Sequence, residues 1–80
     1  MKIQLIAFGI AKDILQCNQL EVELSEGDTI SALKQKLFQQ YPDLSGLKSI
    51  SFAVGEDYQE DSYTLREHDE VVIIPPVAGG

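Results

Sequence analysis

The feature that most constrains this chain is one segment with helical periodicity, residues 29–41, set among segments that alternate with a period of two. The apolar residues of the segment recur at i, i+3, i+7 and i+11 and so share one face of a helix: Ile30, Leu33, Leu37 and Tyr41. Asp28 or Thr29 can cap its start. Pro42 ends it, because proline has no N–H and disfavours helical geometry in the residue before it. We therefore expect one main helix.

The remaining ordered segments read as strands. Residues 2–8, 19–24, 50–54 and 71–74 are strand-forming, and 19–24 has the cleanest alternation. We interpret residues 9–18 as a connecting loop, and the acidic stretch 55–63 as a turn or a short edge strand. The order strand, strand, helix, strand, short strand or turn, strand predicts an α+β protein with a mixed sheet of four to five strands packed on one main helix. This is the order of the β-grasp, or ubiquitin-like, fold.

Length and charge limit the functions that such a chain can have. Eighty residues suffice for one domain with a thin core. The net charge of −7 argues against nucleic acid or an anionic membrane as a partner and favours a basic docking surface, although solubility alone also explains it. No stretch is long enough to span a membrane, so we expect a cytoplasmic protein.

The body of the domain shows no pattern of catalytic or metal-binding residues. Cys17 is the single cysteine, which excludes an internal disulfide, a zinc cluster and four-cysteine iron–sulfur ligation. His68 lies in a charged turn, where an ordinary exposed role is expected. The carboxylates of residues 56–61 do not have the spacing of a calcium loop and are interpreted as a solvated edge.

The C-terminal stretch "VVIIPPVAGG" is the one segment whose composition suggests a function. Pro75 and Pro76 stiffen the exit from the last strand. Gly79 and Gly80 have no Cβ, so the backbone there is thin enough to enter a narrow channel, and the last carboxylate is unshielded. The alternative is a frayed terminus that ends on glycine by chance. We expect residues 1–76 to form the domain and residues 77–80 a flexible tail.

Three segments carry a resemblance to a known family: "FGIAKD" at 8–13, "LKQKLFQQYPDL" at 33–44, and "TLREHDEVVIIPPVAGG" at 64–80. The last is the most specific, with a Leu before a turn, Asp-Glu-Val opening the final strand and Pro-Pro leading to Gly-Gly. Together they resemble the MoaD/ThiS family of sulfur carriers, in particular its MoaD branch, the small subunits of molybdopterin synthase. The chain departs from the family at His68, where Gly is usual, and at Gly55, where Asn is frequent.

The resemblance implies a sulfur carrier in molybdenum cofactor biosynthesis. Gly80 would be adenylated, converted to a thiocarboxylate and used to donate sulfur to precursor Z. The chain itself would bind no cofactor and no metal, while ATP with magnesium would be used by the activating partner. The catalytic residues would lie on the large subunit of a heterotetrameric synthase.

The implied partners are that large subunit, an adenylyltransferase of the ubiquitin-activating type and a sulfur-donating enzyme. The tail that enters the partner would be Val77, Ala78 and Gly79, and the partner-binding residues would be Phe8, Val72, Ile74, Pro75 and Pro76. From the residues alone, two interpretations of the strand 71–74 remain open. Its outward side chains form such a docking patch, or the strand is buried on both faces.

Three alternatives stay open from the sequence. A thiamine-pathway carrier and a ubiquitin-like modifier share the Gly-Gly end, although thiamine carriers look shorter and typically lack the Pro-Pro exit. A β-grasp interaction module without chemistry is the alternative from another class, because a fold does not determine a function.

Overall fold

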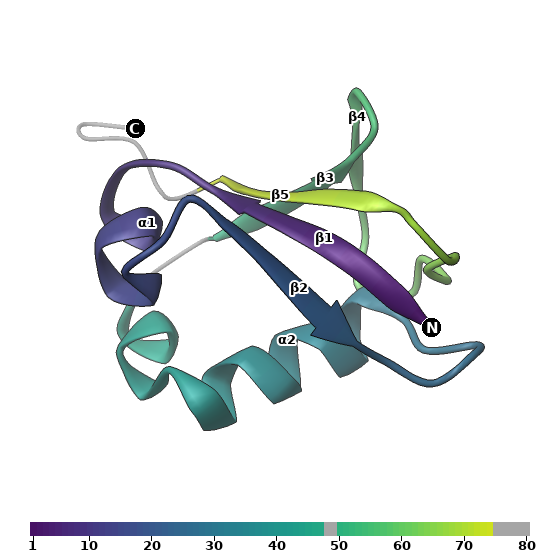
Figure 1. Cartoon of the computed structure of the whole chain (residues 1–80), viewed down its shortest axis with the longest axis horizontal. Helices are drawn as coiled ribbons and strands as arrows, with labels where there is room; N and C mark the ends of the chain where they lie inside the picture. The colour runs from purple at the N-terminus through teal and green to yellow at the C-terminus, as the bar shows by residue number, and fades with distance from the viewer. Residues whose placement is uncertain (48–49, 75–80) are drawn as a thin grey trace.

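The first and last strands of the described chain lie side by side at the centre of the sheet and run parallel (Figure 1). The computed structural model describes residues 1–47 and 50–74. The sheet has five strands in the order β2-β1-β5-β3-β4, and every pairing other than β1 with β5 is antiparallel. The strands are β1 (Lys2–Ala7), β2 (Gln19–Glu23), β3 (Ser51–Val54), β4 (Asp57–Gln59) and β5 (Glu70–Ile74). The acidic stretch thus contains the short edge strand that was one of its two expected forms.

Helix α2 (Ile30–Gln40) covers one face of this sheet and matches the predicted helix to within a residue at each end (Figure 1). Thr29 is its N-cap: the Ala32 N–H donates to the Thr29 hydroxyl oxygen at 3.3 Å. The N–H groups of the first two helix residues have their acceptors in the loop after β4. Ile30 N–H donates to the Tyr63 carbonyl and Ser31 N–H to the Asp61 carbonyl, both at 3.0 Å. The first N–H groups of a helix have no acceptor within the helix, so these hydrogen bonds stabilise the start of α2 and hold the loop against it.

The prediction of a loop over residues 9–18 is wrong, because the structure has a helix there, α1 (Gly9–Leu15). Ala11 and Leu15, one turn apart, are both buried against the core. The helix ends at Gln16, which has a left-handed φ of 62° and whose N–H donates to the Lys12 carbonyl at 2.8 Å. Only two buried positions mark α1, which is too few for periodicity alone to distinguish it from a loop.

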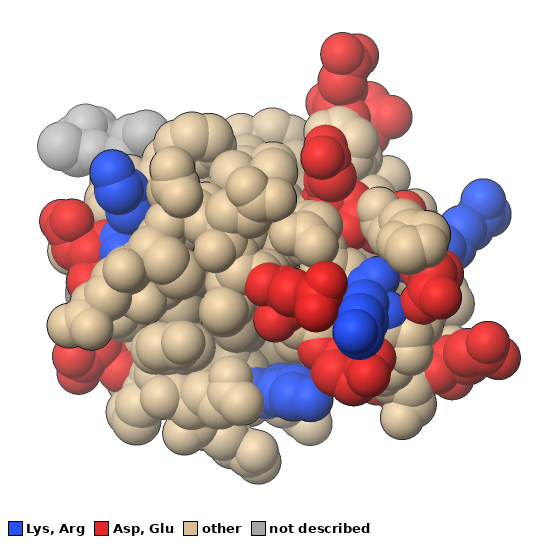
Figure 2. Space-filling model, in the orientation of Figure 1, with Lys and Arg blue, Asp and Glu red and all other residues tan. Residues whose placement is uncertain are grey.

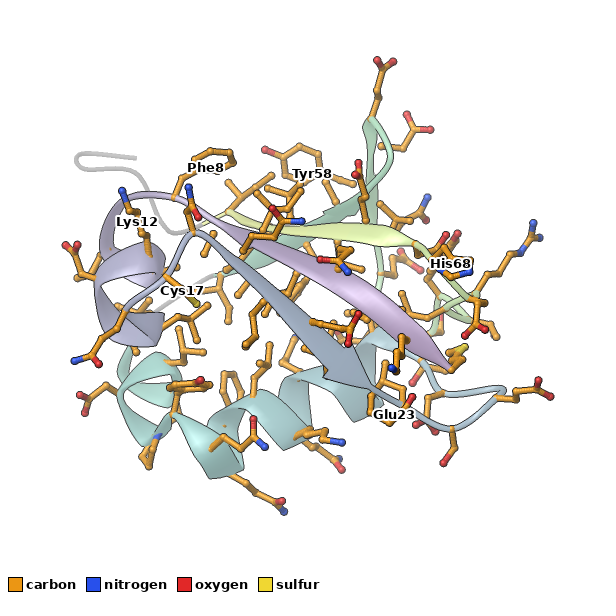
Figure 3. All side chains as sticks on the ribbon, viewed as in Figure 1. Phe8, Lys12, Cys17, Glu23, Tyr58 and His68 are labelled. Atoms are coloured by element: carbon orange, nitrogen blue, oxygen red, sulfur yellow. The ribbon has the colours of Figure 1, made fainter. Side chains whose placement is uncertain are left out.

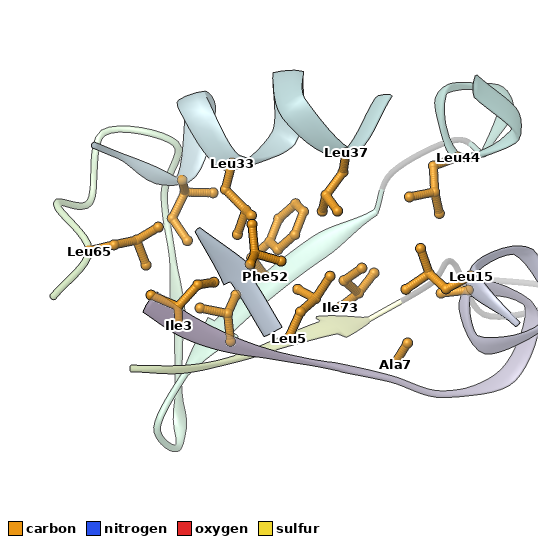
Figure 4. Close-up of a cluster of buried hydrophobic side chains, with 14 of the residues drawn as sticks. Ile3, Leu5, Ala7, Leu15, Leu33, Leu37, Leu44, Phe52, Leu65 and Ile73 are labelled. Carbon is orange, nitrogen blue, oxygen red and sulfur yellow. The ribbon is translucent and has the colours of Figure 1, made fainter. Parts of the chain in front are cut away.

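The core lies between the sheet and α2 (Figure 4). Leu33 and Leu37 from the helix meet Ile3, Leu5 and other residues of the inner sheet face. Leu44, on the 3₁₀ turn η1 (Pro42–Gly46), is fully buried at one end, and Leu47 packs against the same cluster. No side chain among the described residues is both polar and buried, so the apolar contact area carries the stability of the domain.

The two positions at which the chain departs from the family pattern both lie in turns of the sheet and both have a positive φ. Gly55 has a φ of 65° in the two-residue turn between β3 and β4, the geometry for which hairpin turns use glycine. His68 has a φ of 68° in the turn before β5, and its N–H donates to the Lys2 carbonyl at 2.8 Å. A histidine in this left-handed conformation carries strain that glycine would not.

The strand order, the parallel central pair and the single covering helix confirm the predicted β-grasp fold. Among the described residues, no helix is both long and apolar enough to cross a membrane.

Candidate functional site

The face of the sheet opposite α2 carries a continuous row of side chains across all five strands. Ile6 of β1 pairs with Val72 of β5, Val72 pairs with Ala53 of β3, and Ala53 pairs with Tyr58 of β4. On the other side Ile6 pairs with Gln19 of β2. Residues paired in a sheet project from the same face, so this register assembles an apolar surface from segments far apart in the sequence.

Two further apolar residues extend this row toward the α1 end of the sheet. Ile74 pairs with Ser51, two residues beyond the Val72–Ala53 pair, and Phe8 follows β1 on the same alternation as Ile6. Figure 3 shows Phe8 and Tyr58 on the side of the sheet away from α2. We call this surface the apolar face; its residues are Ile6, Phe8, Ala53, Tyr58, Val72 and Ile74.

Exposure of large apolar side chains distinguishes this face from an ordinary sheet surface. Phe8 is 58% exposed and Tyr58 is 67% exposed, while Ile6, Val72 and Ile74 are half-buried. Exposed aromatic and aliphatic residues gathered in one patch are typical of a protein–protein interface. Of the two alternatives left open for this strand, burial on both faces does not hold, because the outward side chains of Val72 and Ile74 are partly exposed.

Polar and acidic residues border the apolar face at the end remote from Ile74. Gln4 of β1 pairs with Glu21 of β2 and with Glu70 of β5, one alternation away from the Ile6 row. The Gln19 amide donates to the Gln4 side-chain oxygen at 3.0 Å, which orders this border. Figure 2 shows an uncharged area on the visible face of the molecule, with acidic and basic side chains beside it and acidic side chains at the outline. An apolar centre with a charged rim is the usual composition of an interface, and the rim here favours a basic partner.

The structure brings together the predicted partner-binding residues that it describes and adds others. Phe8, Val72 and Ile74 all lie on the apolar face. The predicted residues Pro75, Pro76, Val77, Ala78, Gly79 and Gly80 lie outside the described residues. Tyr58 and the 48% exposed Ile10 are additional exposed apolar residues that the sequence reasoning missed. A short strand at residues 57–59 would have indicated that Tyr58 points to one face of the sheet. Which residues lie beside Tyr58 depends on the pairing of β4 with β3.

The other candidate side chains do not form a site. His68 is exposed in its turn, and Cys17 is half-buried where it packs at the margin of the core. Within residues 1–47 and 50–74, no group of three or more His, Cys, Asp or Glu side chains is placed to hold a metal ion. The arrangement of the described side chains therefore suits the binding of a partner protein.

The chain is therefore a small β-grasp protein with an exposed apolar surface beside the end of β5. The chain belongs to the ThiS family, whose family model matches residues 5–80. It is similar to the molybdopterin synthase sulfur carrier subunits of Chlamydomonas reinhardtii, with 31% identity over 83 residues and the whole of both chains covered, and of Mycobacterium tuberculosis, with 32% identity over 84 residues, all of this chain and 99% of the relative.

Solved structures with the same fold include molybdopterin-converting factor subunits and archaeal modifier proteins. A putative molybdopterin converting factor subunit 1 from Pyrococcus furiosus superposes with a TM-score of 0.89 at 20% identity, over 96% of this chain and 99% of that one. The small archaeal modifier protein SAMP1 from Haloferax volcanii gives 0.86 at 17% identity, with both chains fully covered. A complex of subunits 1 and 2 of molybdopterin-converting factor from Helicobacter pylori gives 0.71 at 18% identity, also with full coverage. These likenesses show the fold alone.

Proposed function

We propose that this chain is the sulfur carrier subunit of a molybdopterin synthase in the cytoplasm, with Gly80 as the residue that carries the sulfur. The observation that supports the proposal most is the full-length similarity to sulfur carrier subunits, combined with an apolar face that ends at Ile74, immediately before the segment "PPVAGG". The solved complex of two converting-factor subunits supports a large subunit as a partner of this chain.

The chemistry follows from the poor reactivity of a carboxylate. An oxygen of the Gly80 carboxylate attacks the α-phosphorus of ATP, bound with magnesium on a ubiquitin-activating-type adenylyltransferase, and pyrophosphate leaves. The mixed anhydride with AMP is a good acyl donor, because AMP is a far better leaving group than oxide. Sulfide-level sulfur supplied by a sulfur-donating enzyme then attacks the acyl carbon of Gly80, AMP leaves with the electrons of the broken acyl–oxygen bond, and a thiocarboxylate remains on Gly80.

The large subunit uses that thiocarboxylate. The apolar face of this chain docks on it and directs residues 77–80 toward its active site, where the sulfur is transferred to precursor Z to build the dithiolene. This chain accelerates the transfer by holding the thiocarboxylate close to precursor Z, and the catalytic residues belong to the large subunit. Gly79 and Gly80 suit a narrow channel because neither carries a Cβ.

The test incubates the purified chain with ATP, magnesium, the adenylyltransferase and the sulfur-donating enzyme, and follows its intact mass. We expect the mass to rise by the difference between a sulfur and an oxygen atom. A chain that lacks Gly80 should not change, and Gly80→Ala should lose transfer to precursor Z because its methyl group obstructs the channel. An unchanged mass for the intact chain, with enzymes proven active on another carrier, would refute the proposal.

The protein that binds or accepts this chain distinguishes the proposed function from the thiamine-pathway, modifier and interaction-module alternatives. Association with a molybdopterin synthase large subunit supports the proposal, whereas association with a thiazole synthase would assign the chain to the thiamine pathway. Isopeptide adducts on lysines in cells would assign it to the modifiers. A plain interaction module would keep its partner after Gly80→Ala and show no sulfur-dependent change in mass.

A further inference from the structure

A second surface, separate from the apolar face, lies along the free edge of β2. A groove of about 290 Å³ runs between this strand and α2, with residues 20–23 on one side and Lys36, Gln40 and Tyr41 on the other. Val22 is buried, and Leu20 and Tyr41 are partly buried against the core, so these three residues give the groove an apolar part between its polar side chains. The groove therefore combines this apolar part with the backbone of an edge strand.

The hydrogen-bond ladder shows which backbone groups β2 presents outward. Leu24 N–H donates to the Met1 carbonyl at 2.8 Å, and Ala7 N–H donates to the Asn18 carbonyl at 3.0 Å. In an antiparallel pair, hydrogen-bonded and non-hydrogen-bonded residues alternate, so the residues between Asn18 and Leu24 that face β1 are Leu20 and Val22. The N–H and C=O groups of Gln19, Glu21 and Glu23 therefore point away from β1, over the groove.

Contacts of Lys36 confirm this direction and limit the free edge. Its ammonium nitrogen donates to the Glu23 carbonyl at 2.6 Å, across the mouth of the groove (Figure 3 labels Glu23). The Glu23 carbonyl thus has its partner on α2, while the Glu21 N–H and C=O lie in the middle of the edge. An added strand can pair with Glu21 without displacing Lys36.

We propose that the β2 edge binds a short extended peptide segment of a partner protein, with the pattern apolar–basic–apolar, by adding it to the sheet as a sixth strand. A segment residue paired with Glu21 projects from the outer face beside the Glu21 carboxylate. Its two neighbours project to the opposite side, into the groove, where they cover Leu20, Val22 and Tyr41. The alternation of a strand thus selects a basic residue flanked by two apolar ones.

Charge supports a basic segment and argues against a second copy of this chain. The Glu21 side chain is 55% exposed, and its ion pair with Lys2 is long, at 3.7 Å, and exposed. Such pairs are weak, so Glu21 is available to a second cation. An antiparallel edge-to-edge dimer through β2 would place Glu21 opposite either Glu21 or Glu23 of the second copy, and like charges in direct opposition destabilise a sheet.

The test titrates the ¹⁵N-labelled full chain with the peptide acetyl-Val-Arg-Val-Arg-Val-amide and records amide chemical shifts and hydrogen exchange. We expect shifts confined to residues 19–23 and to Lys36, Gln40 and Tyr41, together with slower exchange of the Glu21 amide. The matched controls are acetyl-Val-Glu-Val-Glu-Val-amide and the arginine peptide N-methylated at its arginines, which cannot donate to the edge. Both controls should bind at least about tenfold more weakly, because one loses the ion pairs and the other the ladder.

A substitution of Glu21 tests the role of its charge from the side of the protein. Glu21→Arg should weaken binding of the arginine peptide about three- to tenfold and improve binding of the glutamate peptide. Glu26→Arg, an equal charge change on an exposed loop residue outside the groove, should leave both affinities within about twofold.

Four outcomes would overturn the proposal. These are equal binding of the N-methylated peptide, equal binding of the glutamate peptide, shifts centred on Ile6 and Val72 instead of Glu21, and concentration-dependent shifts at β2 without any peptide. The third would assign the peptide to the apolar face, and the fourth would assign the edge to a second copy. None of these outcomes bears on sulfur loading, so the inference stands or falls separately from the proposed function.

Discussion

Ile6 and Val72 lie side by side in the parallel ladder at the centre of the sheet, and both remain half-buried on the face that α2 does not cover. All-parallel sheets are normally covered on both faces, whereas a sheet with antiparallel pairs can leave one face open. In this chain α2 occupies one face, and α1 lies at the end of the sheet near Phe8 (Figure 1). The centre of the sheet is therefore left apolar and accessible, which is the condition for docking.

Val72→Arg should weaken binding of the proposed large subunit by about 2 kcal/mol or more, roughly thirtyfold, because a charge would be buried at the centre of the interface. Isothermal titration calorimetry with the purified large subunit measures the change. Gln39→Arg adds the same charge at an exposed position of α2 and should leave the affinity unchanged. Equal affinities of the two variants would show that the apolar face is not the docking surface.

Association with a basic partner should depend on salt through its rate. A chain with a net charge of −7 attracts such a partner over about a Debye length, which is about 10 Å at 0.1 M salt and about 3 Å at 1 M. The association rate should thus fall by at least tenfold between 0.05 M and 0.5 M sodium chloride, with little change in dissociation. Stopped-flow fluorescence gives both rates. A salt-independent association rate would leave solubility as the whole explanation of the charge.

His68→Gly should raise the free energy of unfolding by about 0.5–1 kcal/mol. Relief of the left-handed strain is worth about 1–2 kcal/mol, and the greater freedom of glycine in the unfolded chain takes back about 0.4–1 kcal/mol. Urea denaturation of both proteins gives the difference. Arg66→Gly, in the same turn but with an ordinary φ, should lower the free energy of unfolding instead. A loss of stability in both variants would argue against strain at His68.

Thr29→Ala should lower the free energy of unfolding by about 1 kcal/mol, because the Ala32 N–H loses its acceptor at the start of α2. Thr29→Ser keeps a hydroxyl in the same place and should recover most of the loss. Ser31→Ala, within the first turn, removes a hydroxyl that is not the cap and should change stability by a few tenths of a kcal/mol. Urea denaturation ranks the three variants, and an equal loss in Ser31→Ala and Thr29→Ala would contradict the cap.

Much of the fold was predictable because its signals are local. The stripe from Ile30 to Tyr41 and the proline after it mark α2, and the alternation at residues 19–24 marks β2. Helix α1 was missed because it is one short element, in which Ala11 and Leu15 alone are buried. Its glycine start and its brief apolar spacing are compatible with a loop until the chain packs it onto the sheet.

The candidate surfaces were less predictable because they depend on which strands become neighbours. Phe8 and Val72 were predicted as partner-binding residues, yet Tyr58 joins them only through the pairing of β4 with β3 and of β3 with β5. The groove beside Glu21 exists only because β2 is at an edge of the sheet and α2 passes beneath it.

Helix α2, strands β1, β2, β3 and β5 and the composition of the tail follow from local sequence, since periodicity, capping and turn propensity act over a few neighbouring residues. The tertiary structure alone decided the strand order, the register that places Ile6 beside Val72, and the backbone groups that remain free on β2. These features arise from contacts between segments up to 66 residues apart, such as Ile6 and Val72, whose energy is realised only when the whole sheet closes on α2.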